Sequence, residues 1–349
     1  MSNRYASEEF LRQLLAKAIA SGASDVHLKV GQPPGVRVAG DIVYFKVDKL
    51  VPEDTEAAAR TILGERATPE LMAGLREHDT SYAVPGLGRF RVNIYRQRGS
   101  FAVALRSIPL KVPTQEDLGL PDAVMELANC ERGLVLAVGA AGNGKSTTLA
   151  AMVDRVNESQ AKHIVTIEDP VEFVHTDKRS AVSQREVGID TGTFASALRA
   201  ALRQDPDVIL VGEIRDGETM EIALQAAETG HLVLSTMHTP DVARSVNRLL
   251  ALSDNPSELR ERIGDCIQGV VAQRLVPRLG GGLVLAMEIL VGTGTVREAI
   301  KRPESNPPLK ELMERGVSPY GMQTFQMAFR QLVAQGLVSK ETAKAFLGS

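Results

Sequence analysis

The stretch Gly139-Ala140-Ala141-Gly142-Asn143-Gly144-Lys145-Ser146-Thr147-Thr148 decides the fold of this chain. It matches the pattern G-x-x-x-x-G-K-[ST], a glycine-rich loop whose backbone N–H groups can turn toward a phosphate. An apolar run at residues 134–138 precedes the loop and is typical of a buried strand, and helical spacing of apolar residues follows from Leu149. Strand, loop and helix in this order predict a site for a nucleoside triphosphate. An ordinary glycine turn before a helix is the alternative, and both flanks argue against it.

The parts of this loop have separate expected roles. Lys145 is expected to reach the terminal phosphates, and the hydroxyl of Ser146 is expected to bind Mg²⁺. The glycines leave space for the backbone to approach the ligand, because they carry no Cβ. The residues expected to bind the nucleotide are Gly139, Ala140, Ala141, Gly142, Asn143, Gly144, Lys145, Ser146 and Thr147.

Length and composition restrict the class of protein. The 349 residues predict two or three domains, and 44% apolar with 24% charged residues is typical of a soluble globular protein. The net charge of −3 gives no overall attraction to nucleic acid or anionic lipid. Cys130 and Cys266 stand far apart in no metal-ligand spacing. Without a signal peptide or a long apolar run, we expect a cytoplasmic protein without membrane insertion or a nucleic-acid partner.

The periodicity of apolar residues predicts four segments: a small α+β domain at 1–108, a proline-containing linker at 109–121, an α/β core at 122–255 and a mostly helical region at 256–349. In the core, near-continuous apolar runs predict strands of a mostly parallel sheet covered on both faces. The predicted core strands are 134–138, 164–167, 208–211 and 232–236, with helices near 195–203 and 217–229. Past residue 255, helices are predicted around 257–275, 295–301, 308–315, 322–335 and 339–347, with a β-like run at 283–290.

In the first domain, the spacing predicts a helix that starts after Ser7 and ends before Gly22. A further helical stretch is predicted at 53–77, with a break at Pro69. Strands are predicted at 24–30, 36–38, 42–45, 80–84, 89–95 and 101–106, and we expect them to form an antiparallel sheet.

Acidic residues follow two of the predicted core strands. Glu168, Asp169 and Glu172 come after the strand at 164–167, and Glu213 follows Gly212 after the strand at 208–211. Ligands of open α/β sheets bind at these strand ends, and an apolar strand that ends in an acid is typical of a Walker B motif. Glu213 is therefore a candidate to place Mg²⁺ or the attacking water, together with Glu168 or Glu172. The alternative is a solvated carboxylate at the end of a strand.

Histidines and arginines supply further candidates. His231 and His238 bracket the strand at 232–236, and one of them is expected to sense the phosphate, although a core or edge role is the alternative. Several arginines crowd the end of the first domain and form either a solvated surface or arginine fingers that reach a triphosphate bound by another subunit. These arginines are Arg89, Arg91, Arg96, Arg98 and Arg106.

Several motifs in order resemble the PilT-like ATPases of type IV pili, within the wider family of secretion-type motor ATPases, over nearly the whole chain. The phosphate loop is similar to the family's Walker A motif, and residues 205–216 are similar to its Walker B motif. Residues 166–173 (Thr-Ile-Glu-Asp-Pro-Val-Glu-Phe) resemble its Asp box, and residues 228–239 resemble its His box. Further matching stretches are 22–28, 88–93 and 321–324.

The resemblance implies a PAS-like first domain, a RecA-like core and a hexameric ring with ATP and Mg²⁺ between subunits. It implies that Arg91 and Arg106 act on a neighbour's nucleotide and that Glu168, Glu172 and Glu213 share water activation and Mg²⁺ placement. It places His238 near the γ-phosphate and gives Ser146 and Glu213 the metal. It also implies an ATP hydrolase that drives pilus retraction and twitching motility. The implied partners are an inner-membrane platform protein, through which the ring lies at the membrane's inner face, and a paralogous ATPase.

Two segments differ from the family pattern. The loop carries Ala140-Ala141 and Asn143 where the family usually has Pro-Thr and Ser, and residues 294–302 match its retraction helix only in part. An alternative is therefore a slow or accessory, PilU-like ring subunit. A secretion or extension ATPase of the same superfamily is another alternative. It is disfavoured because many of those proteins carry a four-cysteine zinc motif, whereas this chain has two cysteines. A RecA-like nucleic-acid translocase is a third alternative, disfavoured by the negative net charge.

Overall fold

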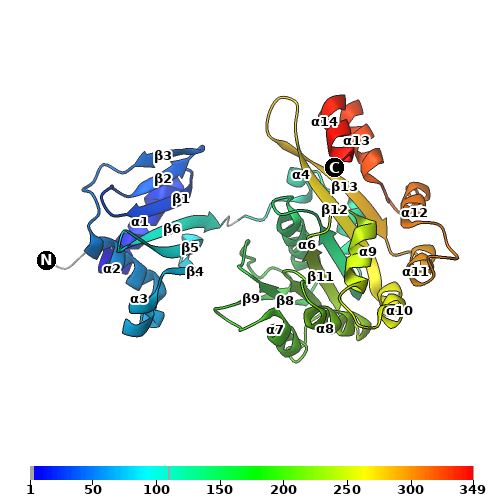
Figure 1. Cartoon of the computed structure of the whole chain (residues 1–349), viewed down its shortest axis with the longest axis horizontal. Helices are drawn as coiled ribbons and strands as arrows, with labels where there is room; N and C mark the ends of the chain where they lie inside the picture. The colour runs from blue at the N-terminus through cyan, green and yellow to red at the C-terminus, as the bar shows by residue number, and fades with distance from the viewer. Residues whose placement is uncertain (1–3, 109–110, 349) are drawn as a thin grey trace. The chain divides into compact units, whose positions relative to one another are not determined.

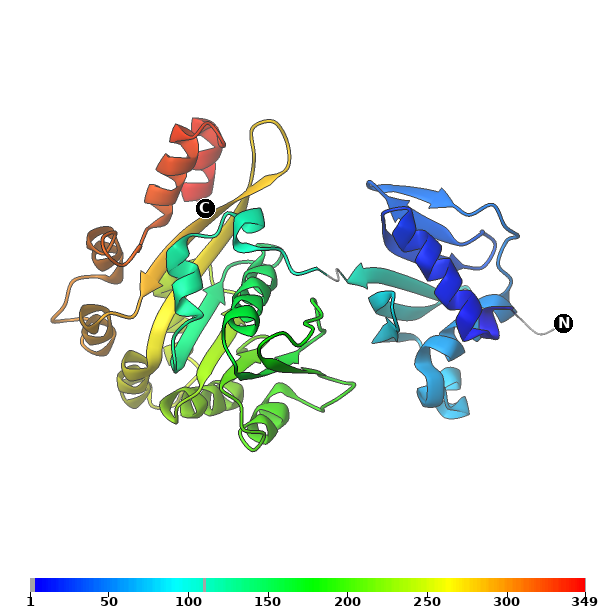
Figure 2. The same ribbon diagram turned by 180° about the vertical axis from the view of Figure 1, so that it is seen from behind.

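The computed structural model describes residues 4–108 and 111–348 and divides into two units, Met1–Lys111 and Val112–Ser349. Each unit has its own sheet (Figures 1 and 2). Residues 109–110 of the expected linker lie outside the described residues. The rest of that linker contains the short helix α4 (Gln115–Leu118), and Leu120 is buried in the core of the second unit.

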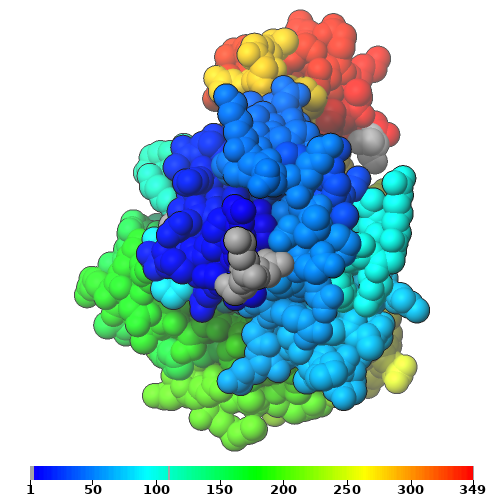
Figure 3. Space-filling model, turned by 90° about the vertical axis from the view of Figure 1, so that its left-hand side faces the viewer, coloured from blue at the N-terminus to red at the C-terminus, as the bar shows by residue number. Residues whose placement is uncertain are grey.

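The N-terminal unit is built on a six-stranded antiparallel sheet in the order β3-β2-β1-β6-β5-β4. Its strands are β1 (Ala23–Lys29), β2 (Gly35–Val38), β3 (Asp41–Tyr44), β4 (Glu77–Val84), β5 (Gly88–Gln97) and β6 (Ser100–Ile108). Its helices are η1 (Arg4–Ala6), α1 (Glu8–Ala20), α2 (Pro52–Leu63), η2 (Gly64–Arg66) and α3 (Pro69–Gly74). In the space-filling view, the atoms of this unit form one packed body coloured blue to cyan (Figure 3).

Local sequence explains the helices of this unit. Ser7 caps α1 by accepting a hydrogen bond from the N–H of Phe10, and Leu11 and Leu15 are fully buried under the sheet. The expected break at Pro69 is wrong in its position, because the helix stops at Leu63 and Pro69 is the first residue of α3. Proline is favoured at the first helical position, where its missing N–H costs nothing.

The C-terminal unit is built on a seven-stranded sheet in the order β13-β12-β7-β11-β10-β8-β9, parallel except for β13. Its strands are β7 (Gly133–Val138), β8 (His163–Glu168), β9 (Ala181–Glu186), β10 (Val208–Val211), β11 (Leu232–Met237), β12 (Ile267–Pro277) and β13 (Leu283–Val291). Its other helices are α5 (Asp122–Leu127), α6 (Lys145–Ser159), α7 (Phe194–Ala201), α8 (Gly217–Glu228), α9 (Val242–Leu250), α10 (Pro256–Cys266), α11 (Gly294–Lys301), α12 (Leu309–Arg315), α13 (Phe325–Ala334) and α14 (Lys340–Leu347).

Helices cover both faces of this sheet. Along β7, Leu134, Leu136 and Val138 pack on the side of α7 to α10, whereas Val135 and Ala137 pack on the side of α5 and α6. This alternation follows from the two-residue period of a strand, and burial on both faces explains the near-continuous apolar runs. The predicted mixed α/β fold with a mostly parallel sheet and a helical C-terminal region is confirmed.

The sheet extends past residue 255, where a separate helical region was expected. The predicted helix at 257–275 ends at Cys266, and β12 then pairs with β7 in parallel while β13 pairs with β12. Residues 256–349 therefore supply two strands to the core sheet as well as the helices α10 to α14. A Cβ at Gly269 would lie 2.5 Å from a methyl group of Leu127 and 3.0 Å from the carbonyl oxygen of Leu290, so glycine allows close packing at this point.

Candidate nucleotide-binding site

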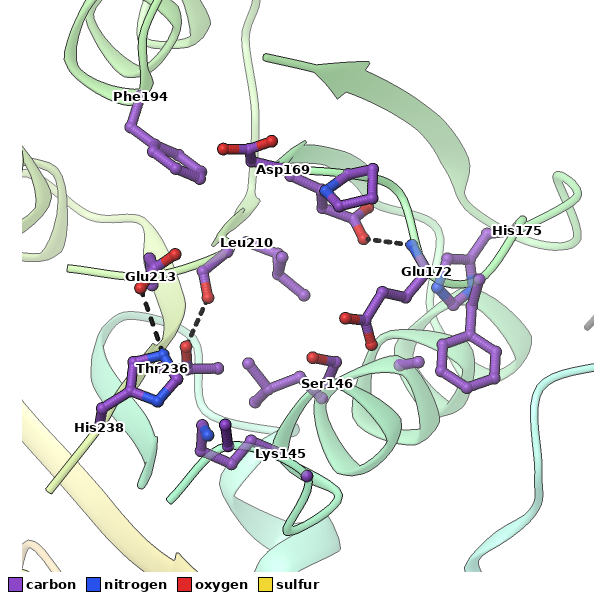
Figure 4. Close-up of a pocket in the computed structure, with 18 residues that line it drawn as sticks. Lys145, Ser146, Asp169, Glu172, His175, Phe194, Leu210, Glu213, Thr236 and His238 are labelled. Carbon is purple, nitrogen blue, oxygen red and sulfur yellow. Dashed lines mark hydrogen bonds and ion pairs between the residues drawn. The ribbon is translucent and has the colours of Figure 1, made fainter. Parts of the chain in front are cut away.

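A pocket opens at the carboxyl ends of the parallel strands in the C-terminal unit (Figure 4). The phosphate loop after β7, the acidic segment after β8, Glu213 after β10 and His238 after β11 all line it. Parallel strands end at the same edge of a sheet, and so residues far apart in the sequence meet there. The structure thus brings together Lys145, Ser146, Glu168, Glu172, Glu213 and His238 from the predicted site.

The phosphate loop presents open donors toward this pocket. Gly144 precedes α6 with a φ of 79° and has no side chain to cap the helix, and Gly142 has a φ of 78°. Each has a backbone conformation that favours glycine. The first N–H groups of α6 are thus available to an anion, and the helix dipole favours negative charge there.

Lys145 is buried against its own loop. Its Nζ donates to the carbonyl oxygens of Gly139 at 2.9 Å and Ala140 at 3.0 Å. Burial lowers the pKa of Lys145, and the negative charges of Glu213 and Glu172 oppose that shift. An ammonium held by two neutral carbonyls can exchange them for phosphate oxygens, which are stronger acceptors.

Glu213 lies on the opposite side of the pocket from α6. Its carboxylate forms an ion pair with Arg215 Nε at 2.5 Å and lies 3.4 Å from His238 Nε2, and its side chain is 11% exposed. The backbone before it is fixed because Thr236 donates to the carbonyl of Gly212. A Cβ at Gly212 would approach the Ile167 carbonyl to 3.2 Å, and glycine avoids this crowding.

Glu168 occupies a drier position in the same pocket. It accepts hydrogen bonds from Thr166 Oγ1 at 2.7 Å, Gln184 Nε2 at 3.1 Å and the N–H of Glu172 at 3.4 Å. Burial raises the pKa of Glu168, although these hydrogen bonds favour the carboxylate. Sequence reasoning did not identify Thr166 or Gln184, which lie opposite each other in the β8–β9 register.

Asp169, Glu172 and His175, from the segment after β8, also line the pocket. Asp169 and Glu172 are exposed, and in Figure 4 Glu172 extends toward Ser146 whereas Asp169 points away from the phosphate loop, on the side of Phe194. His175 is almost completely buried in the wall, and its Nδ1 lies 3.9 Å from Asp154 Oδ1. Burial lowers the pKa of His175, with Asp154 acting in the opposite direction.

The remaining predicted residues lie elsewhere. His231 is at the start of β11, the far end from the pocket, and its ring bonds to the carbonyl of Ala226. Of the two histidines considered as phosphate sensors, the pocket therefore contains His238. Arg91 and Arg106 are directly opposite each other on β5 and β6 of the N-terminal unit, and both are exposed. Arg106 Nε bonds to Asp25 Oδ1 at 2.9 Å.

The donors of the pocket suit a magnesium nucleotide. Open helix N–H groups and a lysine match phosphate oxygens, and the Ser146 hydroxyl and Glu213 supply hard oxygen atoms of the kind Mg²⁺ prefers. Within residues 4–108 and 111–348, no group of three or more His, Cys, Asp or Glu side chains could hold a metal ion.

The phosphate loop between β7 and α6 of a mainly parallel sheet, faced by acids from the ends of neighbouring strands, defines a P-loop nucleoside triphosphatase. A protein-family model with the description "Type II/IV secretion system protein" matches residues 2–282 of the chain. The chain belongs to this family.

Individual relatives are similar over almost the whole chain. The "Type IV pilus retractation ATPase PilT" of Pseudomonas aeruginosa is 43% identical, over 96% of this chain and 97% of the relative. The "Type IV pilus ATPase PilU" of the same organism is 38% identical, over 97% and 88%. A crystal structure of the pilus retraction motor PilT with bound ADP superposes with a TM-score of 0.87 at 43% identity, covering 96% of each chain. The predicted PilT-like family, RecA-like fold and ATPase class are confirmed.

Across the parts of the chain that the structure describes, no helix is long and apolar enough to cross a bilayer.

Proposed function

We propose that this chain is the motor subunit of a hexameric ATPase that drives the disassembly of a type IV pilus, and so twitching motility. The observation that carries the proposal is the pocket in which Lys145, Ser146, Glu168, Glu213 and His238 meet at one sheet edge. The likeness to PilT over nearly the full length of both chains supports retraction as the task. We place the ring in the cytoplasm, bound to the membrane through a platform protein.

The residues of the pocket divide the work of hydrolysis. Lys145 and the N–H groups of α6 bind the phosphates, and the Ser146 hydroxyl and Glu213 would hold Mg²⁺. When bound, Mg²⁺ would neutralise negative charge on the phosphate oxygens. Glu168, with its raised pKa, accepts a proton from the attacking water, and Glu172 lies beside it. His238, beside Glu213, contacts the terminal phosphate and reports its loss.

In the ring that we propose, a neighbouring subunit completes each pocket. Arg91 and Arg106 are exposed on one face of the N-terminal sheet and carry charge suited to a developing phosphate anion. Hydrolysis then removes the contact that holds neighbouring units together, and their rotation drives pilin release. The PilU-like paralogue is a second proposed partner of the ring.

A slow, accessory subunit is the second candidate function. The alanines at 140 and 141 favour it, because they restrict the backbone of the loop less than a proline would. Similarity to PilU over 97% of the chain is consistent with either role.

Turnover by the purified chain separates the two candidates. We expect robust ATP hydrolysis, about 10²- to 10³-fold reduced in Glu213→Ala, with the size of the ring unchanged by light scattering. Pilus retraction is then imaged in cells that lack the gene and are complemented with wild type or Glu213→Ala. Fast turnover by Glu213→Ala would refute the assigned mechanism, and slow turnover by the wild type would favour the accessory role.

A further inference from the structure

Strand β12 extends further than its neighbour β7, which ends where the phosphate loop begins. The last residue pair between β7 and β12 is Val138 with Ala272, whereas β12 continues to Pro277. From residue 273 onward, the edge of β12 that faces β7 has lost its strand partner, because the chain of β7 has turned into the loop. Buried backbone N–H groups need an acceptor, and so the loop must supply one.

The loop supplies this acceptor through Asn143. The Oδ1 of Asn143 accepts a hydrogen bond from the N–H of Leu275 at 2.9 Å. Its Nδ2 donates to the carbonyl oxygen of Ala140 at 3.3 Å, within the same loop. The carboxamide of Asn143 therefore connects Ala140, within the phosphate loop, to Leu275 at the edge of β12.

Two further contacts fix the loop on the same strand. A Cβ at Gly139 would lie 2.6 Å from the carbonyl oxygen of Gln273, so the backbone of the loop runs directly along β12. The buried Gln273 Nε2 donates to Thr148 Oγ1 at 2.7 Å and ties the first turn of α6 to the strand. Residues 273–275 of β12 therefore hold the loop at its start, its apex and its end.

We propose that Asn143 is a positioning residue, whose carboxamide takes the place of a strand carbonyl and holds the phosphate loop against β12. This proposal depends on the proposed function in one respect only, namely that the loop binds the phosphates of a nucleotide. Ala140 shows why the bond matters. Its carbonyl accepts from both Lys145 and Asn143, and Lys145 leaves it when the ammonium turns to a phosphate. Asn143 then keeps Ala140 and Leu275 together while the nucleotide is bound.

The first measurement uses the full-length protein without nucleotide. Amide hydrogen exchange at Leu275 is followed by NMR in wild type, Asn143→Ala and Asn143→Asp. We expect exchange about tenfold faster in Asn143→Ala, because the acceptor is lost, and near-wild-type exchange in Asn143→Asp, which keeps an oxygen at that place. Unchanged exchange at Leu275 in Asn143→Ala overturns the proposal.

The second measurement separates positioning from direct contact with the reacting phosphate. In Asn143→Ala, the dissociation constants of Mg-ADP and of a non-hydrolysable Mg-ATP analogue should both rise about fivefold, with kcat changed less than twofold. Asn129→Ala is the matched control, since it removes an exposed asparagine that bonds Glu126 and Gln160 outside the pocket. A loss confined to the ATP analogue or to kcat overturns the positioning role. Failure of the wild type to bind either nucleotide would instead refute the proposed function, and the exchange result would still decide the role of Asn143.

Discussion

The two units of the chain use their sheets in opposite ways. In the C-terminal unit, parallel strands end at one edge, where Lys145, Glu168 and Glu213 line a single pocket. In the N-terminal unit, antiparallel strands place Arg91 and Arg106 side by side on an exposed sheet face. A parallel sheet brings functional groups together because every strand points the same way, whereas one face of an antiparallel sheet can remain exposed to solvent. The C-terminal unit contains the pocket, and we propose that the N-terminal unit contributes positive charge to the pocket of a neighbouring subunit.

The largest effect is expected in the C-terminal unit. Lys145→Ala should lower ATP turnover by about 10⁴-fold or more, since it removes the only lysine of the described pocket lining and its charge on the phosphates. Turnover is measured with the purified protein, and circular dichroism checks the fold. Turnover within tenfold of wild type would remove the phosphate loop from the mechanism.

The next effect tests whether the open arginine face serves a neighbour. Arg106→Ala and Arg91→Ala should each lower turnover by about 10³-fold if the guanidinium acts on the transferred phosphoryl group. The matched control is Arg12→Ala, which changes an exposed arginine on α1 of the same unit.

Mixed rings sharpen this test. Lys145→Ala and Arg106→Ala subunits, mixed one to one, should recover activity at about a quarter of the interfaces, because one interface in four is intact when each site uses two subunits. A mixture as inactive as its parts would place both residues in the same subunit's site. Full activity of Arg106→Ala and Arg91→Ala would indicate that these arginines form only a solvated surface.

A smaller effect concerns the pH dependence of kcat and the buried carboxyl group of Glu168. Because burial raises the pKa of Glu168, its carboxylate is lost at a higher pH than that of an ordinary glutamate as the solution is acidified. We expect kcat to fall through that raised pKa on the acidic side. In Glu168→Gln, kcat should be about 10²-fold lower and this acidic limb should disappear. Glu172→Gln is the control that keeps the limb, and a limb that persists in Glu168→Gln would assign the base to another residue.

The smallest effect lies in the N-terminal unit. Burial opposes ionisation of Asp25, but hydrogen bonds from Ser24 and Arg106 outweigh it and lower the pKa of Asp25. Such a group stabilises the fold above its unfolded-state pKa, and the stabilisation is lost as the pH falls through the folded-state pKa. Asp25→Asn should therefore lower the free energy of unfolding by less than about 1 kcal/mol at pH 6, since Arg106 is 70% exposed, and by less still below about pH 4. Urea unfolding at both pH values measures this, and a larger loss at the lower pH would contradict it.

The sequence predicted the strands that local pattern controls. The near-continuous apolar runs at 208–211 and 232–236 became β10 and β11, because strands covered on both faces are built mostly of apolar residues. Strand β9 was not predicted, since it lies at the sheet edge and carries polar, partly exposed residues. Strand β12 was predicted as helix, because its partner β7 lies more than a hundred residues earlier and local periodicity cannot reveal that pairing.

The site divides in the same manner. By itself the sequence determined the phosphate loop, the acids after β8 and β10 and the choice of ligand, because glycine spacing and strand-end acids carry their chemistry locally. The family resemblance had already placed His238 near the phosphate, and only the tertiary structure decided that Gln184 and Thr166 hold Glu168 and that Asn143 meets Leu275. The physical reason is register: which side chains meet depends on how distant strands align, and that alignment is a property of the whole packed sheet.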